Sequence, residues 1–286
     1  MKSILLSALT LLSAVPMSLG TAFTSSAPPL PDSISQNINS AGTGWKICTP
    51  HGGNAGGTSP ASEACGGVGS NQPSAWSWNF GSTMQINVST NATSNETQIL
   101  FVYQGPGCDD CTTITMDKWI EPTADANVIA NNELDMYQFD HTHLKKRMFG
   151  LQCNQQRGFM QWQIHNVGGG YWKNTGITDH CPLPTDSYTH IVYQGHWIIG
   201  DTGCDGMGCN YYDSLTINGK LYPLRVKMKA ATLPGWRAIC GSQDQIDLRA
   251  SSGGTLTGGR NIQNSNVTCS NGNSASASAA DTASSP

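Results

Sequence analysis

Charged residues are scarce in this sequence: Asp, Glu, Lys and Arg make up 12% of its 286 residues, and the formal net charge is −4. A surface with so few positive charges has no electrostatic attraction for nucleic acid or for an anionic membrane. The composition therefore predicts no nucleic-acid partner. The chain is instead rich in Gly, Ser, Thr, Asn and Gln, with eight Trp and eight Tyr. Uncharged polar groups and flat aromatic rings suit neutral sugars, so we expect a polysaccharide or another glycan as the partner.

Long hydrophobic runs are also lacking, with one exception at the N-terminus. Residues 4–15 are almost wholly apolar, follow the basic start at Lys2 and precede the small residues Ser18 and Gly20. This arrangement is typical of a secretory signal peptide, and the run is too short to cross a bilayer as a helix. No later segment approaches that length. We therefore expect cleavage near Gly20, no membrane span, and a secreted protein, either extracellular or periplasmic.

Helical periodicity is the third absence, because no window shows a clear 3.6-residue apolar period. Short runs instead alternate polar and apolar residues or are rich in β-forming residues, with turn signals between them. The strongest local signal is Asn218-Gly219 between two alternating runs, which is typical of a type I′ hairpin. Together the runs predict an all-β sandwich. The expected strands are 83–89, 98–104, 132–140, 159–165, 189–199, 214–222, 224–229 and 245–249.

Ten cysteines are consistent with export, because disulfides form in oxidising compartments. Proximity in the sequence suggests mostly local pairs, although connectivity cannot be deduced from sequence alone. The expected pairs are Cys48–Cys65, Cys108–Cys111, Cys153–Cys181, Cys204–Cys209 and Cys240–Cys269. The expected organisation is a signal peptide over 1–20, a linker or N-terminal arm over 21–44, a disulfide-stapled β-sandwich over 45–269 and a disordered tail over 270–286.

One predicted strand, residues 132–140, carries an unusual polar strip. Successive side chains of a strand point to opposite faces, so Glu133, Asp135 and Tyr137 share one face while Leu134 and Met136 share the other. Carboxylates are rarely buried without partners, so a strand that packs both faces does not carry such a strip. We therefore expect the strip to form the floor of an open cleft.

The order of several motifs resembles that of the concanavalin A-like lectin/glucanase superfamily. The motifs are the acidic stretch Glu133-Leu-Asp-Met-Tyr-Gln-Phe139, the stretch 149–153, the phrase 189–193 and the hairpin 215–220. More narrowly, they resemble secreted proteins of soil bacteria and fungi with that fold. The resemblance covers roughly residues 80–250. It implies a jelly roll of two antiparallel sheets whose concave face meets polysaccharide.

Laminarinase-type β-glucanases of this superfamily place the nucleophile, a supporting Asp and the acid/base Glu on one strand. The resemblance assigns Glu133 as the nucleophile and Asp135 as the supporting group, while the acid/base position holds Gln138 or, in the shorter motif, Tyr137. A retaining glycosidase needs a second carboxyl about 5–5.5 Å from the first. An amide cannot donate that proton. This departure favours glycan binding without hydrolysis, unless a bulge turns Asp140 toward the site.

A polysaccharide lyase is the alternative enzyme. Jelly-roll lyases that act on uronate polymers resemble this chain at Gln163-Ile164-His165. In such enzymes the Gln helps to neutralise the substrate carboxylate, and a His or a Tyr, here His165 or Tyr171, is the base. The simpler interpretation is that Gln161, Gln163 and His165 line a sugar-binding face.

Aromatic residues beside Gly or polar breaks are candidate stacking surfaces for sugar rings. They are Trp76, Trp78, Trp172 and Trp197, whereas Trp162 is expected in the core. Tyr137 and Gln161 complete the predicted binding set.

No cofactor is expected, although the Gly-rich loop 200–209 has two carboxylates that would permit a Ca²⁺ site. Asp140, His141 and His143 are either metal ligands or a solvated turn.

The leading interpretation is thus a secreted β-sandwich that binds glycan on its concave face. A glycan-cleaving enzyme, either an atypical glucanase or a lyase, is the second. A structural or adhesive envelope protein is the third, because both tails are of low complexity.

Overall fold

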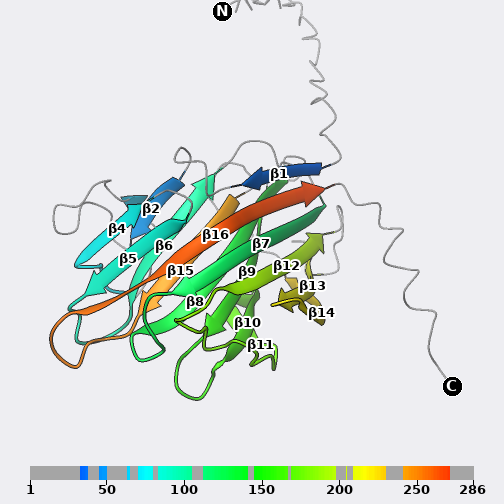
Figure 1. Cartoon of the computed structure of the whole chain (residues 1–286). Helices are drawn as coiled ribbons and strands as arrows, with labels where there is room; N and C mark the ends of the chain where they lie inside the picture. The colour runs from blue at the N-terminus through cyan, green and yellow to red at the C-terminus, as the bar shows by residue number, and fades with distance from the viewer. Residues whose placement is uncertain are drawn as a thin grey trace, which may run out of the picture.

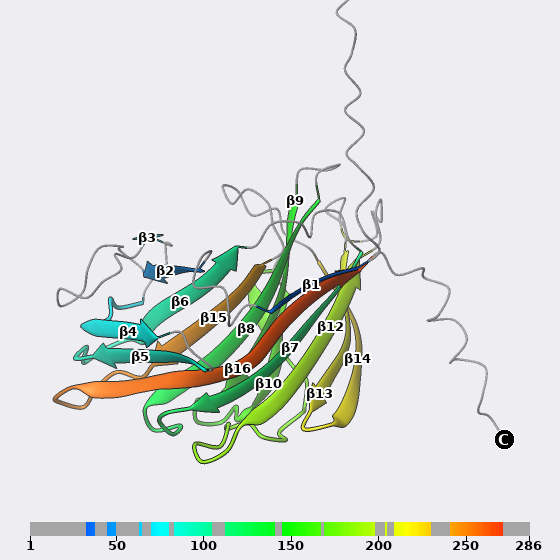
Figure 2. The ribbon, with the colours of Figure 1, turned by 45° about the horizontal axis from the view of Figure 1, so that its top comes forward.

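The computed structural model describes residues 33–37, 45–49, 63–64, 70–79, 83–104, 112–140, 145–166, 169–197, 204, 209–229 and 241–270. These residues form two β-sheets that lie one behind the other, as Figure 1 and Figure 2 show. All strand pairs are antiparallel except the short pair at one edge, β2 with β3. The predicted all-β sandwich of two antiparallel sheets is confirmed.

We call the first sheet the β7 sheet. Its strands, in order across the sheet, are β14 (Lys220–Lys229), β13 (Cys209–Ile217), β12 (Thr189–Trp197), β7 (Thr113–Pro122), β16 (Leu256–Ser270), β5 (Met84–Thr90) and β4 (Ala75–Asn79). An eighth strand, β1 (Ser33–Asn37), pairs with β16, and both views show the two side by side. Part of the expected N-terminal arm therefore adds a strand to the sandwich.

We call the second sheet the β8 sheet. Its strands, in order, are β11 (Tyr171–Asn174), β10 (Gln161–Asn166), β9 (Lys145–Asn154), β8 (Ile129–Asp140), β15 (Gly241–Leu248), β6 (Thr97–Gln104), β2 (Trp45–Thr49) and β3 (Glu63–Ala64). The strip of residues 132–140 lies on β8, near the middle of this sheet. Its neighbours on the two sides are β9 and β15.

The predicted hairpin is confirmed. Asn218 and Gly219, with φ of 47° and 82°, join β13 to β14, and only a left-handed pair of residues makes this turn. Glycine is also required at position 195 of β12, because a side chain would not fit there. A Cβ there would lie 2.5 Å from Cδ1 of Phe149, and the register of β12 against β13 shifts between Gln194 and Gly195.

The core lies between the sheets and is built by strict alternation along the strands. Every second residue of β12 is buried, and Leu134 and Met136 of β8 are fully buried, as the alternation predicted. Burying a large apolar side chain contributes about 1.5–3 kcal/mol. Trp162 is also fully buried, which confirms its expected place in the core.

Two other tryptophans correct the sequence analysis. Trp76 is 2% exposed and Trp197 is 1% exposed, so neither is a surface for sugar stacking. Both side chains belong to strands of the β7 sheet and point into the core, and the Gly and polar residues beside them mark strand ends rather than exposed sites. Trp78 is partly buried and packs against Phe101, with ring centroids 6.0 Å apart.

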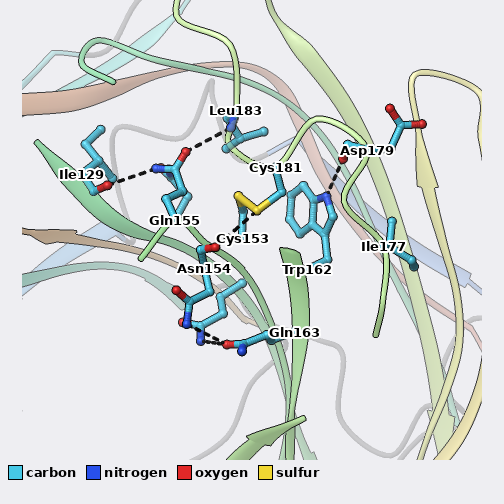
Figure 3. Close-up of a disulfide and its surroundings, with 12 residues drawn as sticks. Ile129, Cys153, Asn154, Gln155, Trp162, Gln163, Ile177, Asp179, Cys181 and Leu183 are labelled. Atoms are coloured by element: carbon cyan, nitrogen blue, oxygen red, sulfur yellow. Dashed lines mark hydrogen bonds between the residues drawn. A yellow bond between two sulfur atoms is a disulfide. The ribbon is translucent and has the colours of Figure 1, made fainter. Parts of the chain in front are cut away.

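Two predicted disulfides are confirmed, Cys153–Cys181 and Cys204–Cys209. Figure 3 shows the first beside Trp162, whose Nε1 donates to the carbonyl of Asp179. The disulfide ties the segment after β11 to β9 and so covers Trp162. The other three predicted pairs involve cysteine side chains outside the described part of the chain. The predicted signal peptide and residues 271–286 of the predicted tail also lie outside it. Among the described residues, no helix has the length and apolar character needed to cross a bilayer.

Candidate functional site

The candidate site is the outer face of the β8 sheet, on the side away from the core. Residues directly opposite one another on neighbouring strands point to the same face. Glu133 lies opposite Gln152 of β9 and Gln245 of β15, and Asp135 lies opposite Gln243. This alternation gathers polar side chains from five strands into what we call the polar face. Its members are Asn131, Glu133, Asp135, Gln152, Asn154, Gln163, Asn174, Gln243, Gln245 and Asp247.

Hydrogen bonds join the acidic half of the polar face into a chain. The Nε2 of Gln243 donates to Oδ2 of Asp135 at 2.9 Å, and the Nε2 of Gln245 donates to Oδ1 of Asp247 at 3.1 Å. Asn131 donates to Oδ2 of Asp247 at 3.1 Å. In these three contacts the carboxyls accept hydrogen bonds from neutral amide groups and not from charged side chains.

The other half consists of amides alone. The Oε1 of Gln163 accepts from Gln152 at 2.6 Å and from Asn154 at 3.1 Å, and its own Nε2 donates to Asn174 at 2.6 Å. Figure 3 shows Asn154 beside Gln163. Gln161 also belongs to this face, because it lies opposite Asn154, and its Oε1 accepts from the backbone of Gly176. Neutral donors and acceptors in such a row match sugar hydroxyls, which both donate and accept.

Glu133 and Asp135 are more buried than the sequence indicated. They are 5% and 0% exposed, so the expected open cleft lined by free carboxylates is wrong. The reason is that long amide side chains on both neighbouring strands pack around them, which the strand's own sequence does not reveal.

The electrostatics of the polar face favour protonated carboxyls. Burial raises the pKa of Glu133 well above its usual range, and the charges of Asp135 and Asp247 raise it further, while Arg260 lowers it. Burial likewise raises the pKa of Asp247 to about 7, with a contribution from Glu96. The shift favours the protonated form of Glu133, beside Asp135.

An aromatic stack stands beside this pair. The rings of His165 on β10 and Trp172 on β11 lie 4.5 Å apart at 17°. They fit over Gly150, where a Cβ would lie 2.6 Å from Cβ of His165 and 3.1 Å from Oδ1 of Asp135. Burial lowers the pKa of His165 to about 4, so its imidazole is neutral at pH 7. Glycine at position 150 is therefore what allows the stack to approach Asp135.

Two tyrosines from the β7 sheet hold the backbone under this stack. The hydroxyl of Tyr212 donates to the carbonyl of His165 at 2.6 Å and accepts from the N–H of Gly150 at 3.3 Å. The hydroxyl of Tyr193 donates to the carbonyl of Gly150 at 3.4 Å. Sequence reasoning missed both residues. The only available signal was the polar tip that each buried tyrosine must satisfy.

The structure brings together some of the predicted residues and separates others. Glu133, Asp135, Gln163, His165 and Trp172 share the polar face. Tyr171 does not, because it lies opposite Asn166 on the other side of β11 and is 54% exposed. Tyr137 and Gln138 lie on β8, but their side chains are outside the described part of the structure.

No metal centre is found within the described residues. Three or more His, Cys, Asp or Glu side chains with a suitable arrangement do not occur there. Of the loop 200–209 proposed for Ca²⁺, only Cys204 and Cys209 belong to the described part of the chain. His141 and His143 lie outside it. The Ca²⁺ site stays a prediction.

The site geometry also limits the chemistry. In a retaining glycosidase the two carboxyls stand about 5–5.5 Å apart with the sugar between them. The position that the resemblance assigns to the second carboxyl holds Gln138 or Tyr137, and neither is a carboxyl. A nucleophile must also be ionised, whereas burial raises the pKa of Glu133 well above its usual range. Both features disfavour that double displacement.

Comparisons with known proteins give structural neighbours of low sequence identity. No protein-family model matches the sequence, and no curated protein matches it. Solved structures similar to it include the Bacillus licheniformis β-glucanase, at 11% identity over 84% of this chain and 98% of that one, with a TM-score of 0.38. The carbohydrate recognition domain of Emp47p matches at 9% identity over 84% and 95% of the two chains, with a TM-score of 0.40.

A third structure, the alginate lyase AlgAT5 from polysaccharide lyase family 7, matches at 12% identity over 79% and 94%, with a TM-score of 0.37. A botulinum neurotoxin type C structure is matched over only 38% of its own length. All four TM-scores lie below 0.5, so the site itself must carry any argument about function.

Proposed function

We propose that this chain is a secreted glycan-binding protein whose ligand lies on the polar face of the β8 sheet, beside the His165–Trp172 stack. The observation that carries the proposal is the row of neutral amides on this face, in which Gln163 is hydrogen-bonded to Gln152, Asn154 and Asn174. The partly exposed indole of Trp172 stands beside this row.

The chemistry of a neutral sugar suits each part of this surface. Asn174 is exposed and offers an amide group at its edge, and the partly exposed ring of Trp172 lies on the same face of β11. Aromatic rings stack on the apolar faces of sugars, and amides bond their hydroxyls. Two disulfides are consistent with an oxidising, extracytoplasmic location.

A lyase is the second candidate, and one observation favours it. His165 is neutral, lies next along the face from Gln163, and its Nδ1 has no hydrogen-bond partner within the described residues. A neutral imidazole can accept a proton. The candidate tyrosine, Tyr171, points away from this histidine, so His165 would act alone.

The test is incubation of the purified protein with neutral and uronate polysaccharides. New reducing ends, the ultraviolet absorbance of an unsaturated uronate, and retention on insoluble glycan are followed together. Retention without either chemical signal is the expected result. Reducing ends on a neutral glycan would overturn the proposal in favour of hydrolysis, and both chemical signals on a uronate polymer would establish a lyase.

A further inference from the structure

A cleft lies at one edge of the sandwich, between the last strands of the two sheets. β11 ends the β8 sheet, β14 ends the β7 sheet, and the neighbour of β11, β10, is in contact with β14. Figure 1 shows these strands at the same end of the molecule. The space between them has a volume of about 250 Å³, and we call it the edge cleft. The lining residues that matter here are Ile164, Lys173, Ile177, Tyr222, Leu224 and Val226.

Strand alternation explains why the walls of the edge cleft are apolar. Ile164 of β10 is 1% exposed and faces the core, and Lys173 of β11 lies directly opposite it, on the same side of the sheet. On the other wall, every second residue of β14 points inward, which places Tyr222, Leu224 and Val226 over the core. These three side chains are only partly buried, so apolar surface remains available to a ligand.

Polar contacts fix the two walls relative to each other. The hydroxyl of Tyr222 donates to Oδ2 of Asp179, and Nζ of Lys220 donates to the same oxygen at 3.3 Å. Asp179 belongs to the segment that the Cys153–Cys181 disulfide ties to β9, and Figure 3 shows Asp179 and Ile177 on this segment. The edge cleft is therefore formed before any ligand arrives, and a preformed site costs less to occupy.

Charge distinguishes the edge cleft from an ordinary gap in packing. None of its lining residues is acidic, and Lys173 is exposed, so its ammonium group stands at the open side. This ammonium group makes no ion pair and no hydrogen bond within the described residues. A cation without a counter-ion beside an apolar wall attracts an anion whose remaining atoms are apolar.

The strand edges beside the cleft argue against a peptide that binds as an added strand. Pro223 removes a backbone donor from β14, and Arg225 of the same strand has a left-handed φ of 47°. β11 has four residues and lies between Gly170 and Gly176, which have φ of 68° and 78°. Proline, irregular backbone and short length are the features by which edge strands avoid pairing. The occupant is therefore a small molecule.

We infer that the edge cleft binds a small monocarboxylate with an apolar body, such as an arylalkanoic or medium-chain fatty acid. The carboxylate pairs with Nζ of Lys173, and the apolar body packs against Ile164, Leu224 and Val226. An apolar cavity of about 150 Å³ holds benzene, so by proportion the edge cleft holds about ten non-hydrogen atoms. The cleft lies on the opposite side of β11 from Trp172, so the inference is independent of the proposed function.

The test is an NMR titration of the whole protein with phenylpropionate and with octanoate, in the absence of glycan, followed through the methyl signals. The signals of Ile164, Leu224 and Val226 are expected to shift, whereas those of Ile86, on β5 far across the β7 sheet, are expected to stay in place. We expect a dissociation constant of about 1 mM or below. The uncharged amides of the two acids are expected to bind about threefold to fivefold more weakly. Shifts that miss the edge cleft, or equal affinity for acid and amide, would overturn the inference.

Three variants assign the ligand to the cleft and to its cation. Lys173→Met is expected to bind the acids about threefold to fivefold more weakly while binding the amides like the parent. Lys227→Met is the matched control, because Lys227 is exposed on the outer side of β14, and it should bind the acids like the parent. Val226→Phe fills the cleft and is expected to bind neither acid nor amide.

Both lysines are exposed, so their variants keep the test decisive if Val226→Phe does not fold. Parental affinity of Lys173→Met for the acids would contradict the role of Lys173. Parental affinity of a folded Val226→Phe would place the ligand elsewhere and overturn the site.

Discussion

The protonated state of the polar face leads to a quantitative prediction for Asp247→Asn. Burial raises the pKa of Asp247 from 3.8 in the unfolded chain to about 7 in the folded one. The folded protein therefore holds a proton that the unfolded chain releases above about pH 4. The stability that this proton contributes is fully present below pH 4 and is lost as the pH rises through 7.

The magnitude follows from the two pKa values. A difference of about 3 pH units, at 1.36 kcal/mol each, gives an upper value of about 4 kcal/mol. Asparagine keeps the shape of the protonated acid and does not titrate. The free energy of unfolding of Asp247→Asn, relative to the parent, should therefore increase by up to about 4 kcal/mol between pH 4 and pH 8.

The assay is urea unfolding of the parent and the variant at each pH. The difference in unfolding free energy between variant and parent cancels the contributions of other titrating groups, above all His165. The pKa of His165 is lowered to about 4, so its contribution to stability is lost as the pH falls from 6.5 to 4, in the opposite sense. Asp186→Asn on the exposed segment before β12 is the matched control. A difference between Asp247→Asn and the parent that does not change with pH would refute the protonated polar face.

Three further changes have defined outcomes. Gly150→Ala should weaken glycan binding and lower stability by about 1–3 kcal/mol, because its Cβ would lie 2.6 Å from that of His165; titration calorimetry and thermal unfolding check both, and unchanged binding would show that the stack is not needed. Tyr212→Phe loses two hydrogen bonds to the backbone of Gly150 and His165 and should lower stability by about 1–3 kcal/mol in urea unfolding, with a wild-type value contradicting the assigned contacts. Glu133→Gln should retain most of the binding, since a neutral amide resembles the protonated acid, whereas Glu133→Ala should lose it; equal loss in both would mean that the ionised form is the one that binds.

Much of the fold could be predicted from alternation. The runs that became β5, β8, β13 and β14 alternate apolar and polar residues, those that became β6 and β12 are rich in β-forming residues, and Asn218-Gly219 marks the turn between β13 and β14. The face on which Glu133 and Asp135 lie also followed from alternation alone. What the strand sequence could not reveal was their burial, because the covering side chains come from β9 and β15, distant in the sequence.

The strands β7 and β16 were not predicted, because each carries a buried cation, Lys118 or Arg260, at a core-facing position. Lys118 stands at an inward position between Met116 and Ile120, and Arg260 stands inward after two glycines. In a sequence, a Lys or Arg at such a position predicts an exposed side chain. The buried partner of Lys118, Asp244, is 126 residues away in the sequence, so no local pattern contains the pair.

Trp76 and Trp197 show the converse failure of prediction from sequence, because the sequence placed them on the surface. Each has a polar neighbour in the sequence, Ser77 or His196, yet both rings are buried because each lies on the inward side of a strand of the β7 sheet. Trp172 looked similar in the sequence and instead lies at the polar face, stacked on His165. Whether a tryptophan points into the core or to the outer face depends on how the two sheets pack, which the local sequence does not reveal.

The central claim is that glycan binds on the polar face of the β8 sheet. It is tested most directly by measuring the affinity of the parent, Trp172→Ala and Trp119→Ala for the glycan that retains the protein. Trp119 is a matched control, because it is 36% exposed and stacks on a histidine, His190, but lies on the outer side of the β7 sheet. Loss of affinity in Trp172→Ala with parental affinity in Trp119→Ala is the predicted result. Parental affinity in Trp172→Ala, with loss in Trp119→Ala, would contradict the claim and move the binding site to the other sheet.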